Sequence, residues 1–317
     1  MIKIKLKAIK VYIIPTVTVS LLIMCFYYSP RVLFYTYELN SGENYVCQTF
    51  NGRLGNHLYQ YASIYGISKV NNLTIILGRN DDLVEYFEVP TARVFMNRDV
   101  CQTFVEKFAN HCCVFDETFM NLPKNKNYKL GVYLQSWKYF QHVFEEVRNE
   151  LTFKKEIKVK AKHVVNNYRN IYVAKFKENV TVVGVHIRRG DIASESFKLG
   201  GVVLVPDSYI RHAVDYFLEK FKSVVFIVCS DDINHAVEVM RYKNLSAEFV
   251  HRQPIYDLAI LSHCDHVLTT SGSFGWWAGF LSRGTVTYYK YPMKEGTFER
   301  SEYNYDDYFP PRWIGLD

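Results

Sequence analysis

Five short apolar runs alternate with amphipathic stretches in the second half of the chain. The runs are rich in valine and other β-formers, which is typical of buried strands. The stretches between them repeat apolar residues at helical spacing, and Asp207 stands where it could cap the first of these helices. This alternation predicts a parallel sheet with helices on both faces. The expected strands are 182–187, 224–229, 247–250, 266–269 and 285–289, and the expected helices are 207–221, 234–242 and 255–263.

The first half opens with a similar pattern. A strand beginning at Tyr45 is followed by a loop with two glycines at 51–56, a helical pattern at 57–70 and a second strand at 74–77. The loop matches neither the Walker pattern nor G-x-G-x-x-G. Residues 85–175 mix short helices with loops, and the charged, largely helical stretch 140–175 is expected to connect the halves. We therefore predict two α/β domains, 45–178 and 179–317.

The N-terminus predicts a membrane anchor. Four lysines within residues 1–10 precede an uncharged 18-residue segment, 11–28, which is at the short end for a membrane span. The lysines predict a cytosolic tail at 1–10, a stem at 29–44 and a luminal body. A cleaved signal peptide is the alternative.

Cysteines and sequons agree with a secretory location. Asn72, Asn179 and Asn244 each begin an N-x-Ser/Thr sequon. Among the cysteines beyond the anchor, Cys101 with Cys112 or Cys113 is the first pair to test. Cys229, in an expected strand, and Cys264, in an expected helix, look like free buried thiols. No cysteines or histidines have the spacing of a structural zinc site.

Composition limits the class of protein. The chain has 317 residues, of which 49% are hydrophobic and 22% charged, enough for two globular domains. The net charge of +6 is scattered, with no basic cluster beyond the N-terminus. Nucleic-acid binding is therefore not expected.

Polar groups follow three of the expected strands in the second half. His186 and Arg188 end the first strand on one face, and Arg189 points to the other face because side chains alternate along a strand. Each group also has a purely structural alternative: an ion pair of Arg188 or Arg189 with Asp191, a helix cap at Asp231, and a small turn that lets a helix pack closely. Together at one sheet edge they favour a nucleotide diphosphate site. The second and third groups are Asp231 with Asp232, and the turn 269–277 with Ser273, Phe274 and Gly275.

No two aspartates in the chain are separated by one residue, so the Asp-x-Asp pair that many sugar transferases use to hold a divalent ion is missing. Without a metal, a departing diphosphate needs arginine and backbone donors. Arg188 suits that role, and no metal or other cofactor is expected.

Four segments of the chain carry a family resemblance. They are Gly52-Arg53-Leu54-Gly55-Asn56 with Tyr59-Gln60-Tyr61-Ala62, His186-x-Arg188-Arg189-x-Asp191, Asp257 to Gly279, and Tyr308 to Gly315. Together they resemble the galactoside α-1,2-fucosyltransferases, over about residues 45–317. The resemblance implies a GT-B-like fold of two Rossmann-type domains facing a cleft, behind a single N-terminal transmembrane helix. It also implies a type II Golgi membrane protein that moves fucose from GDP-fucose to the 2-hydroxyl of a terminal galactose on a glycan, inverting the anomeric centre without a metal.

By this resemblance, Arg188 would hold the β-phosphate of GDP and stabilise it as the leaving group. His186 would contact the nucleoside or the phosphate, and Asp231 or Asp232 the guanine or the ribose. Ser273, Phe274 and Gly275 would line the phosphate or fucose pocket.

The resemblance also places Arg53 and Asn56 near the fucose and the pyrophosphate. One departure is His57, where the family usually has glutamine, which adds a titratable group. Asp191 is either the general base or a residue that orients Arg188 or Arg189, and we expect it to brace Arg189.

Two other functions compete with this hypothesis. The enzyme could keep GDP-fucose but use another sugar or a protein hydroxyl, with the acceptor selected by loops 80–140. The chain could instead be an inactive luminal relative that binds glycans. The intact arginine motif, glycine loop and aromatic turn disfavour the second alternative.

Overall fold

The computed structural model describes residues 39–131 and 133–317. The predicted cytosolic tail, the predicted anchor and most of the predicted stem lie outside the described residues. Within the described part, no helix is both long enough and apolar enough to span a bilayer.

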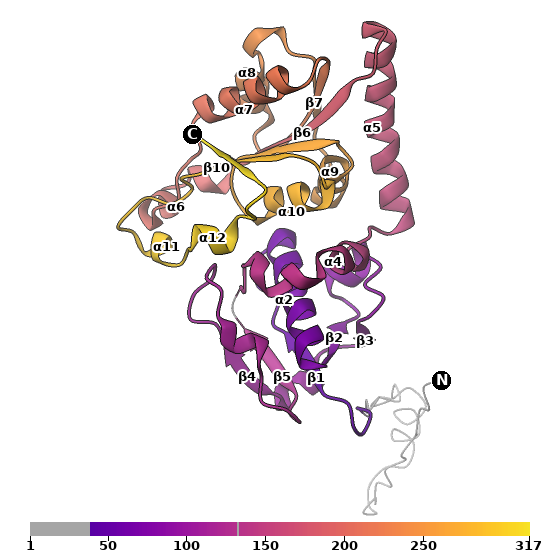
Figure 1. The fold of residues 1–317 in the computed structure, drawn as a ribbon, viewed down its shortest axis with the longest axis vertical. Helices are drawn as coiled ribbons and strands as arrows, with labels where there is room; N and C mark the ends of the chain where they lie inside the picture. Colours follow the sequence, from indigo (N-terminus) through magenta and orange to yellow (C-terminus); the bar gives the residue numbers. More distant parts are fainter. Residues whose placement is uncertain (1–38, 132) are drawn as a thin grey trace, which may run out of the picture. The chain divides into compact units, whose positions relative to one another are not determined.

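The first sheet has five parallel strands in the order β3-β2-β1-β5-β4. The order of the predicted opening unit is confirmed, with β1, the glycine loop, helix α2 and β2 (Figure 1). The helix begins at Leu54, three residues earlier than expected, so Gly55 and Asn56 belong to its first turn and not to the loop. Its elements are β1 (Tyr45–Gln48), α2 (Leu54–Asn71), β2 (Thr74–Gly78), α3 (Asp82–Tyr86), β3 (Arg93–Phe95), η1 (Asp99–Thr103), β4 (Val105–Phe108), η2 (Glu117–Met120), β5 (Tyr128–Gly131), η3 (Trp137–Val143) and α4 (Phe144–Glu150).

Strands β3, β4 and β5 lie in the stretch where the sequence indicated only short helices and loops. The expectation was wrong because β3 and β4 are the two edges of the sheet and have no continuous buried run. Three of the four residues of β4 are exposed, and the central residue of β3 is exposed. An apolar-run criterion detects fully buried strands and passes over such edges.

The second sheet has six parallel strands in the order β11-β10-β9-β6-β7-β8. All five predicted strands and all three predicted helices are present, with ends shifted by at most two residues, and β11 is an addition. Helix α5 (Lys155–Phe176) connects the two sheets. The elements that follow it are β6 (Thr181–Ile187), η4 (Asp191–Ala193), α6 (Glu195–Gly200), α7 (Asp207–Lys220), β7 (Val224–Ser230), α8 (Ile233–Met240), η5 (Tyr242–Asn244), β8 (Ala247–Val250), α9 (Pro254–Ser262), β9 (His266–Thr269), α10 (Ser273–Ser282), β10 (Val286–Tyr289), α11 (Phe298–Ser301), α12 (Tyr305–Tyr308) and β11 (Ile314–Leu316).

The expected capping role of Asp207 is wrong. Asp207 is the first residue of α7, Pro206 precedes it at the cap position, and no side chain caps this helix. The Asp207 carboxylate instead lies 3.0 Å from the imidazole Nε2 of His235. The fold class, α/β with two parallel sheets, is confirmed.

Strand β6 separates two hydrophobic cores. Val183, Val185 and Ile187 face the core that contains residues of α7 and α8. Val182 faces the other core, which contains residues of α9 and α10. This alternation continues past the end of the strand and decides where the two arginines point.

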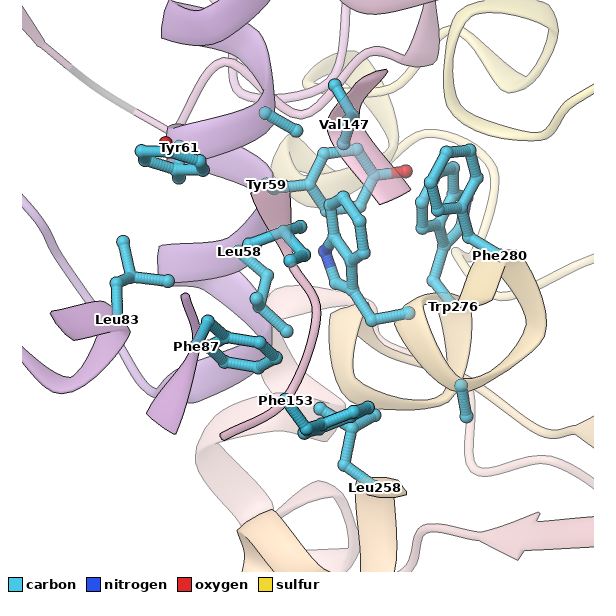
Figure 2. Packing of buried hydrophobic residues seen from close by; sticks show 14 of the residues in the cluster. Leu58, Tyr59, Tyr61, Leu83, Phe87, Val147, Phe153, Leu258, Trp276 and Phe280 are labelled. Carbon is cyan, nitrogen blue, oxygen red and sulfur yellow. The ribbon is translucent and has the colours of Figure 1, made fainter. Parts of the chain in front are cut away.

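The core on the α10 side continues into the first sheet's unit. Tyr59 of α2 packs on Trp276 of α10 with ring centroids 4.4 Å apart (Figure 2). Both side chains donate hydrogen bonds to the main-chain oxygen of Tyr308. Phe140 stacks on Trp277 at 6.0 Å. One continuous aromatic core therefore joins α2 to α10.

The disulfide expectation for Cys101 is wrong. Cys101 pairs with Cys47, and Cys112 pairs with its neighbour Cys113. Cys47 of β1 and Cys101 of η1 are buried in one small cluster on the same face of the first sheet. Sequence spacing could not reveal that proximity, because it depends on how η1 folds back onto β1. Cys229 and Cys264 are free and buried, as predicted.

Candidate active site

The strand order of the second sheet locates the candidate site. Counted from β6, the order β8-β7-β6-β9-β10-β11 is the 3-2-1-4-5-6 arrangement of a Rossmann fold. The chain leaves β6 toward β7 on one side and returns to β9 on the other side. In such sheets the ligand lies outside the carboxyl ends of the two strands where the direction reverses. Here those strands are β6 and β9, which end at Ile187 and Thr269.

Arg188 begins the loop after β6 and stands at this point. Its main-chain N–H donates to Thr270 Oγ1 over 3.0 Å. Its guanidinium Nε and Nη2 donate to Asp191 Oδ1 over 3.2 and 3.0 Å. A Cβ atom on Gly272 would lie only 2.2 Å from Nη1 of Arg188. Gly272, with φ +86°, therefore gives the arginine room beside the turn that begins α10.

Asp191 holds two arginines from opposite halves of the protein. Besides Arg188, it pairs with Arg53 of the glycine loop, whose Nη2 lies 3.3 Å from Asp191 Oδ2. The Arg53 side chain is 82% exposed, so this pair adds little stability. Arg53 therefore lies beside the arginine motif. Asp191 was expected to orient Arg188 or Arg189, and it orients Arg188.

Arg189 points to the opposite face, as strand alternation predicts, but its expected brace is wrong. Its Nη1 lies 3.1 Å from His235 Nε2 and 3.8 Å from the carboxylate of Asp207. Asp191 does not pair with Arg189, because its carboxylate lies on the face of Arg188 and is bound to that arginine. Arg189 thus ties the loop after β6 to α7 and α8.

His186 is buried beneath Arg188 as a neutral imidazole. Burial, against the opposing effect of Asp231 and together with the smaller effect of the Arg188 charge, lowers the pKa of His186 to about 4. Its ring packs on Phe274 at 5.0 Å. Within the described residues its Nδ1 has no hydrogen-bond partner, and neither do Thr269 Oγ1 and Ser271 Oγ. Unpaired buried polar atoms are costly unless a ligand or an ordered water completes their hydrogen bonding.

The turn after β9 brings the two halves into contact at the starts of α2 and α10. Ser273 Oγ donates to Asn56 Oδ1, which also accepts a 3.0 Å bond from Gln135 Nε2. A Cβ atom on Gly55 would lie 2.5 Å from the Phe274 main-chain nitrogen. The N-termini of both helices therefore lie next to each other, and a helix N-terminus favours a nearby anion. Asn56 and Ser273 tie these helix starts together.

Gly275 sits above the buried polar atoms. A Cβ atom there would lie 1.8 Å from Thr269 Oγ1 and 2.6 Å from His186 Nδ1. Only glycine lets α10 approach the ends of β6 and β9 this closely. The structure thus brings Gly275 together with His186, as the sequence indicated.

The two aspartates after β7 have different surroundings. Asp232 caps α8, accepting the His235 N–H over 3.1 Å. Asp231, the alternative helix cap, accepts the Arg189 N–H over 2.8 Å instead. Asp231 is exposed at the end of the strand adjacent to β6, the position at which an acid binds a ribose hydroxyl in many Rossmann folds.

Asp257 of α9 was not among the predicted site residues, although it begins one of the resemblance segments. Its carboxylate is buried and accepts the Arg252 N–H over 3.1 Å. Burial raises the pKa of Asp257 to about 6, against the smaller opposing effects of this hydrogen bond and of His251 and Arg252.

A cavity of about 350 Å³ opens beside Arg188 and the turn 269–272. Much of its wall was not predicted as part of a site. Of loops 80–140, Cys112 and Tyr133 reach it. The sequence signal was present only in part, because segment 308–315 belongs to the resemblance. The other lining residues are Ile192, Phe197, Val202, Trp276, Pro292, Met293, Phe298, Glu299, Glu302, Tyr303, Tyr308, Phe309 and Trp313.

His57, which replaces the usual glutamine, is held by an acid. Its Nδ1 lies 2.8 Å from the carboxylate of Asp82, and its ring lies 5.5 Å from that of Phe50. Among residues 39–131 and 133–317, no group of His, Cys, Asp and Glu side chains is arranged to hold a metal ion.

The strand order is that of a Rossmann-type α/β protein, and Arg188 stands at its switch point. The chain belongs to glycosyl transferase family 11, whose model matches residues 9–317. It is 25% identical over 271 residues to the galactoside 2-alpha-L-fucosyltransferase SEC1 of Bos taurus, covering 84% of this chain and 72% of that protein. It is 26% identical over 274 residues to the galactoside alpha-(1,2)-fucosyltransferase 1 of Homo sapiens, covering 84% and 73%.

Similar solved structures include a variant of Arabidopsis thaliana FUT1 in complex with GDP, with a TM-score of 0.47 and 13% identity, covering 79% of this chain and 71% of that one. The NodZ alpha-1,6-fucosyltransferase soaked with GDP-fucose has a TM-score of 0.46 and 14% identity, covering 78% and 96%.

Proposed function

We propose that this glycosyltransferase moves fucose from GDP-fucose to the 2-hydroxyl of a terminal galactose on a glycan, inverting the anomeric centre. The observation that carries the proposal is Arg188, held by Asp191 at the switch point between β6 and β9. The two relatives reported above support the linkage, because each is named as a galactoside 2-fucosyltransferase. Membership of family 11 supports the reaction class.

In this proposal the diphosphate lies on Arg188 and on the starts of α10 and α2. Charge develops on the leaving phosphate as its bond to the sugar breaks, and a guanidinium stabilises that charge without first having to reorganise. The unpaired Ser271 Oγ and Thr269 Oγ1 supply further hydrogen-bonding groups. Asp231 or Asp232 would bind the ribose or the guanine, and Asp231 is the more accessible of the two.

The neutral state of His186 fits this site. A protonated imidazole beneath Arg188 would add a second buried positive charge, whereas the neutral ring can donate or accept one hydrogen bond. Gly275, Ser273 and Phe274 would form the wall of the donor site. The two parallel sheets support the GT-B-like fold that the sequence resemblance implies.

The test is transfer from GDP-fucose to lactose and N-acetyllactosamine, with GDP-mannose and UDP-galactose as alternative donors. The linkage is read by NMR of the product. Arg188→Ala should lower kcat/KM by about 10²–10³-fold, while the exposed Arg211→Ala serves as the matched control. Activity with another donor, or equal activity of Arg188→Ala and wild type, would refute the proposal. Unchanged activity in EDTA is expected, because we propose a metal-independent reaction.

The product of this assay also distinguishes the alternatives. If the fucose is found on another sugar or on a protein hydroxyl, the proposed donor stands and the proposed galactoside acceptor does not. Glycan binding on an array without transfer would instead identify an inactive relative.

We further propose a Golgi location, with residues 11–28 as a signal-anchor and the described body in the lumen. The Cys47–Cys101 disulfide supports an oxidising compartment. The three sequon asparagines, Asn72, Asn179 and Asn244, are all exposed. Removal of N-glycans should therefore lower the apparent mass of the full chain in three steps. A chain that gains no glycan in a secretory host, or that a protease digests in sealed microsomes, would contradict this topology.

A further inference from the structure

Glu299 of α11 is the acid on the cavity wall that, within the described part of the chain, has a buried carboxylate oxygen without a hydrogen-bond partner. It lines the cavity that Arg188 also lines. Its Oε2 is buried and receives no hydrogen bond. The other acid on the wall, Glu302, accepts the Cys112 N–H over 2.9 Å and contacts His111 Nδ1 at 3.0 Å. The two glutamates, three residues apart, therefore differ. Both carboxylate oxygens of Glu302 have a polar contact, whereas Oε2 of Glu299 has none.

A buried carboxylate oxygen without a donor destabilises the folded protein, because the water it has lost is not replaced. Such atoms are rare in native structures and concentrate where a ligand completes the hydrogen bonding. Gly200 leaves the space for this carboxylate, since a Cβ atom there would lie 2.1 Å from Glu299 Oε1. The site is thus shaped for a free carboxylate beside the cavity.

The other candidate bases around the cavity are less suitable. The Asp191 carboxylate is occupied by Arg188 and Arg53, so its lone pairs are already engaged. Burial raises the pKa of Tyr303 to about 12, and it stays a neutral phenol near pH 7. Of these side chains, Glu299 is the carboxylate that can accept a proton from a bound hydroxyl.

We propose that Glu299 is the general base that deprotonates the acceptor hydroxyl. This inference rests on the proposed fucosyl transfer. The acceptor oxygen forms a bond to the anomeric carbon as the bond from that carbon to the β-phosphate oxygen breaks. The electron pair of the broken bond leaves with GDP at Arg188, and the hydroxyl proton passes to the Glu299 carboxylate. The cavity between these two residues then holds the fucose and the attacking sugar.

The test compares Glu299→Gln with wild type, and Glu295→Gln is the matched control. Glu295 is an exposed glutamate in the same segment, paired with Arg300 outside the cavity. Three quantities are measured on the purified protein: transfer to a galactose-terminated acceptor, the Kd for GDP, and formation of fucosyl azide when azide replaces the acceptor. Azide carries no proton, so its attack needs no base.

Glu299→Gln should lose about 10²–10⁴-fold in kcat for the hydroxyl acceptor, with an unchanged Kd for GDP and unchanged azide transfer. Glu295→Gln should match wild type. A loss smaller than tenfold overturns the inference, as does an equal loss with azide, which would indicate a structural defect. If wild type transfers no fucose, the proposed function itself fails. If wild type transfers fucose and Glu299→Gln does so equally well, only the role of Glu299 is refuted.

Discussion

Gly55→Ala tests whether the contact between the starts of α2 and α10 sets the geometry of the site. The added Cβ would lie 2.5 Å from the Phe274 nitrogen and 2.8 Å from both the carbonyl carbon and Oγ of Ser273. Two of these three atoms belong to the main chain, so they cannot rotate away. The 2.5 Å separation would have to open by about 0.9 Å to reach the 3.4 Å of an ordinary contact.

The expected cost has two parts. Forcing a methyl group into a packed interface costs about 1–3 kcal/mol. Opening it also weakens the Ser273–Asn56 hydrogen bond, worth about 0.5–1.5 kcal/mol. The free energy of unfolding should therefore fall by about 2–4 kcal/mol. A displacement near 1 Å within the site should lower kcat/KM for transfer by about 10²-fold.

The assay pairs urea unfolding with fucosyl transfer, and Gly78→Ala is the control. A Cβ atom on Gly78 would meet nothing closer than 3.4 Å, so this variant should behave as wild type. The reasoning fails if Gly55→Ala unfolds at the wild-type urea concentration and transfers fucose within threefold of the wild-type rate. A variant that is destabilised but fully active would show that the contact supports the fold and not the site.

Three further predictions follow from single side chains. Arg188→Lys keeps the charge but loses the two-pronged donor, so transfer should fall by about 10²-fold while the Tm changes little; transfer within threefold of wild type would contradict this. The pKa of His186 is lower in the folded than in the unfolded protein, so the unfolded chain binds more protons between about pH 6.5 and 4. The contribution of neutral His186 to the free energy of unfolding is complete above pH 6.5 and falls by about 3 kcal/mol as the pH drops to 4. The free energies of unfolding of wild type and His186→Gln, measured in urea, should therefore converge on acidification; a constant difference would refute the assignment. Replacing Cys47 and Cys101 together by serine opens a loop with a sequence separation of 54 residues and should cost about 4 kcal/mol in thermal unfolding; an unchanged Tm would argue against the disulfide.

The sequence predicted the second half better than the first for a physical reason. Strands β6 and β7 are buried on both faces, so each is a continuous apolar run that a pattern can detect. The edge strand β4 has mixed exposure and no such run. Burial on both faces made β6 and β7 predictable, but it is not a complete rule, because the partly exposed edge strand β8 was predicted and the mostly buried β5 was not.

The site divides in the same way. Alternation along β6 correctly sent Arg188 and Arg189 to opposite faces, because that rule is local. The partners of Arg189 could not be predicted, since Asp207 and His235 reach it only through the packing of α7 and α8. Glu299 was missed because its segment has no strand-like or helix-like pattern of its own.

The aromatic contact of Tyr59 with Trp276 and Tyr308 has a consequence for engineering. One way to seek a changed acceptor preference is to build a chimaera of two family members in which the unit of one sheet is exchanged. If two relatives were joined within α5, the α2 of one would pack on the α10 of the other, although these two surfaces did not evolve together. A workable exchange would move Tyr59, Trp276 and the Tyr308 segment as one set, together with Gly55 and Ser273. The practical module of this enzyme is therefore the helix pair between the sheets, and not either sheet by itself.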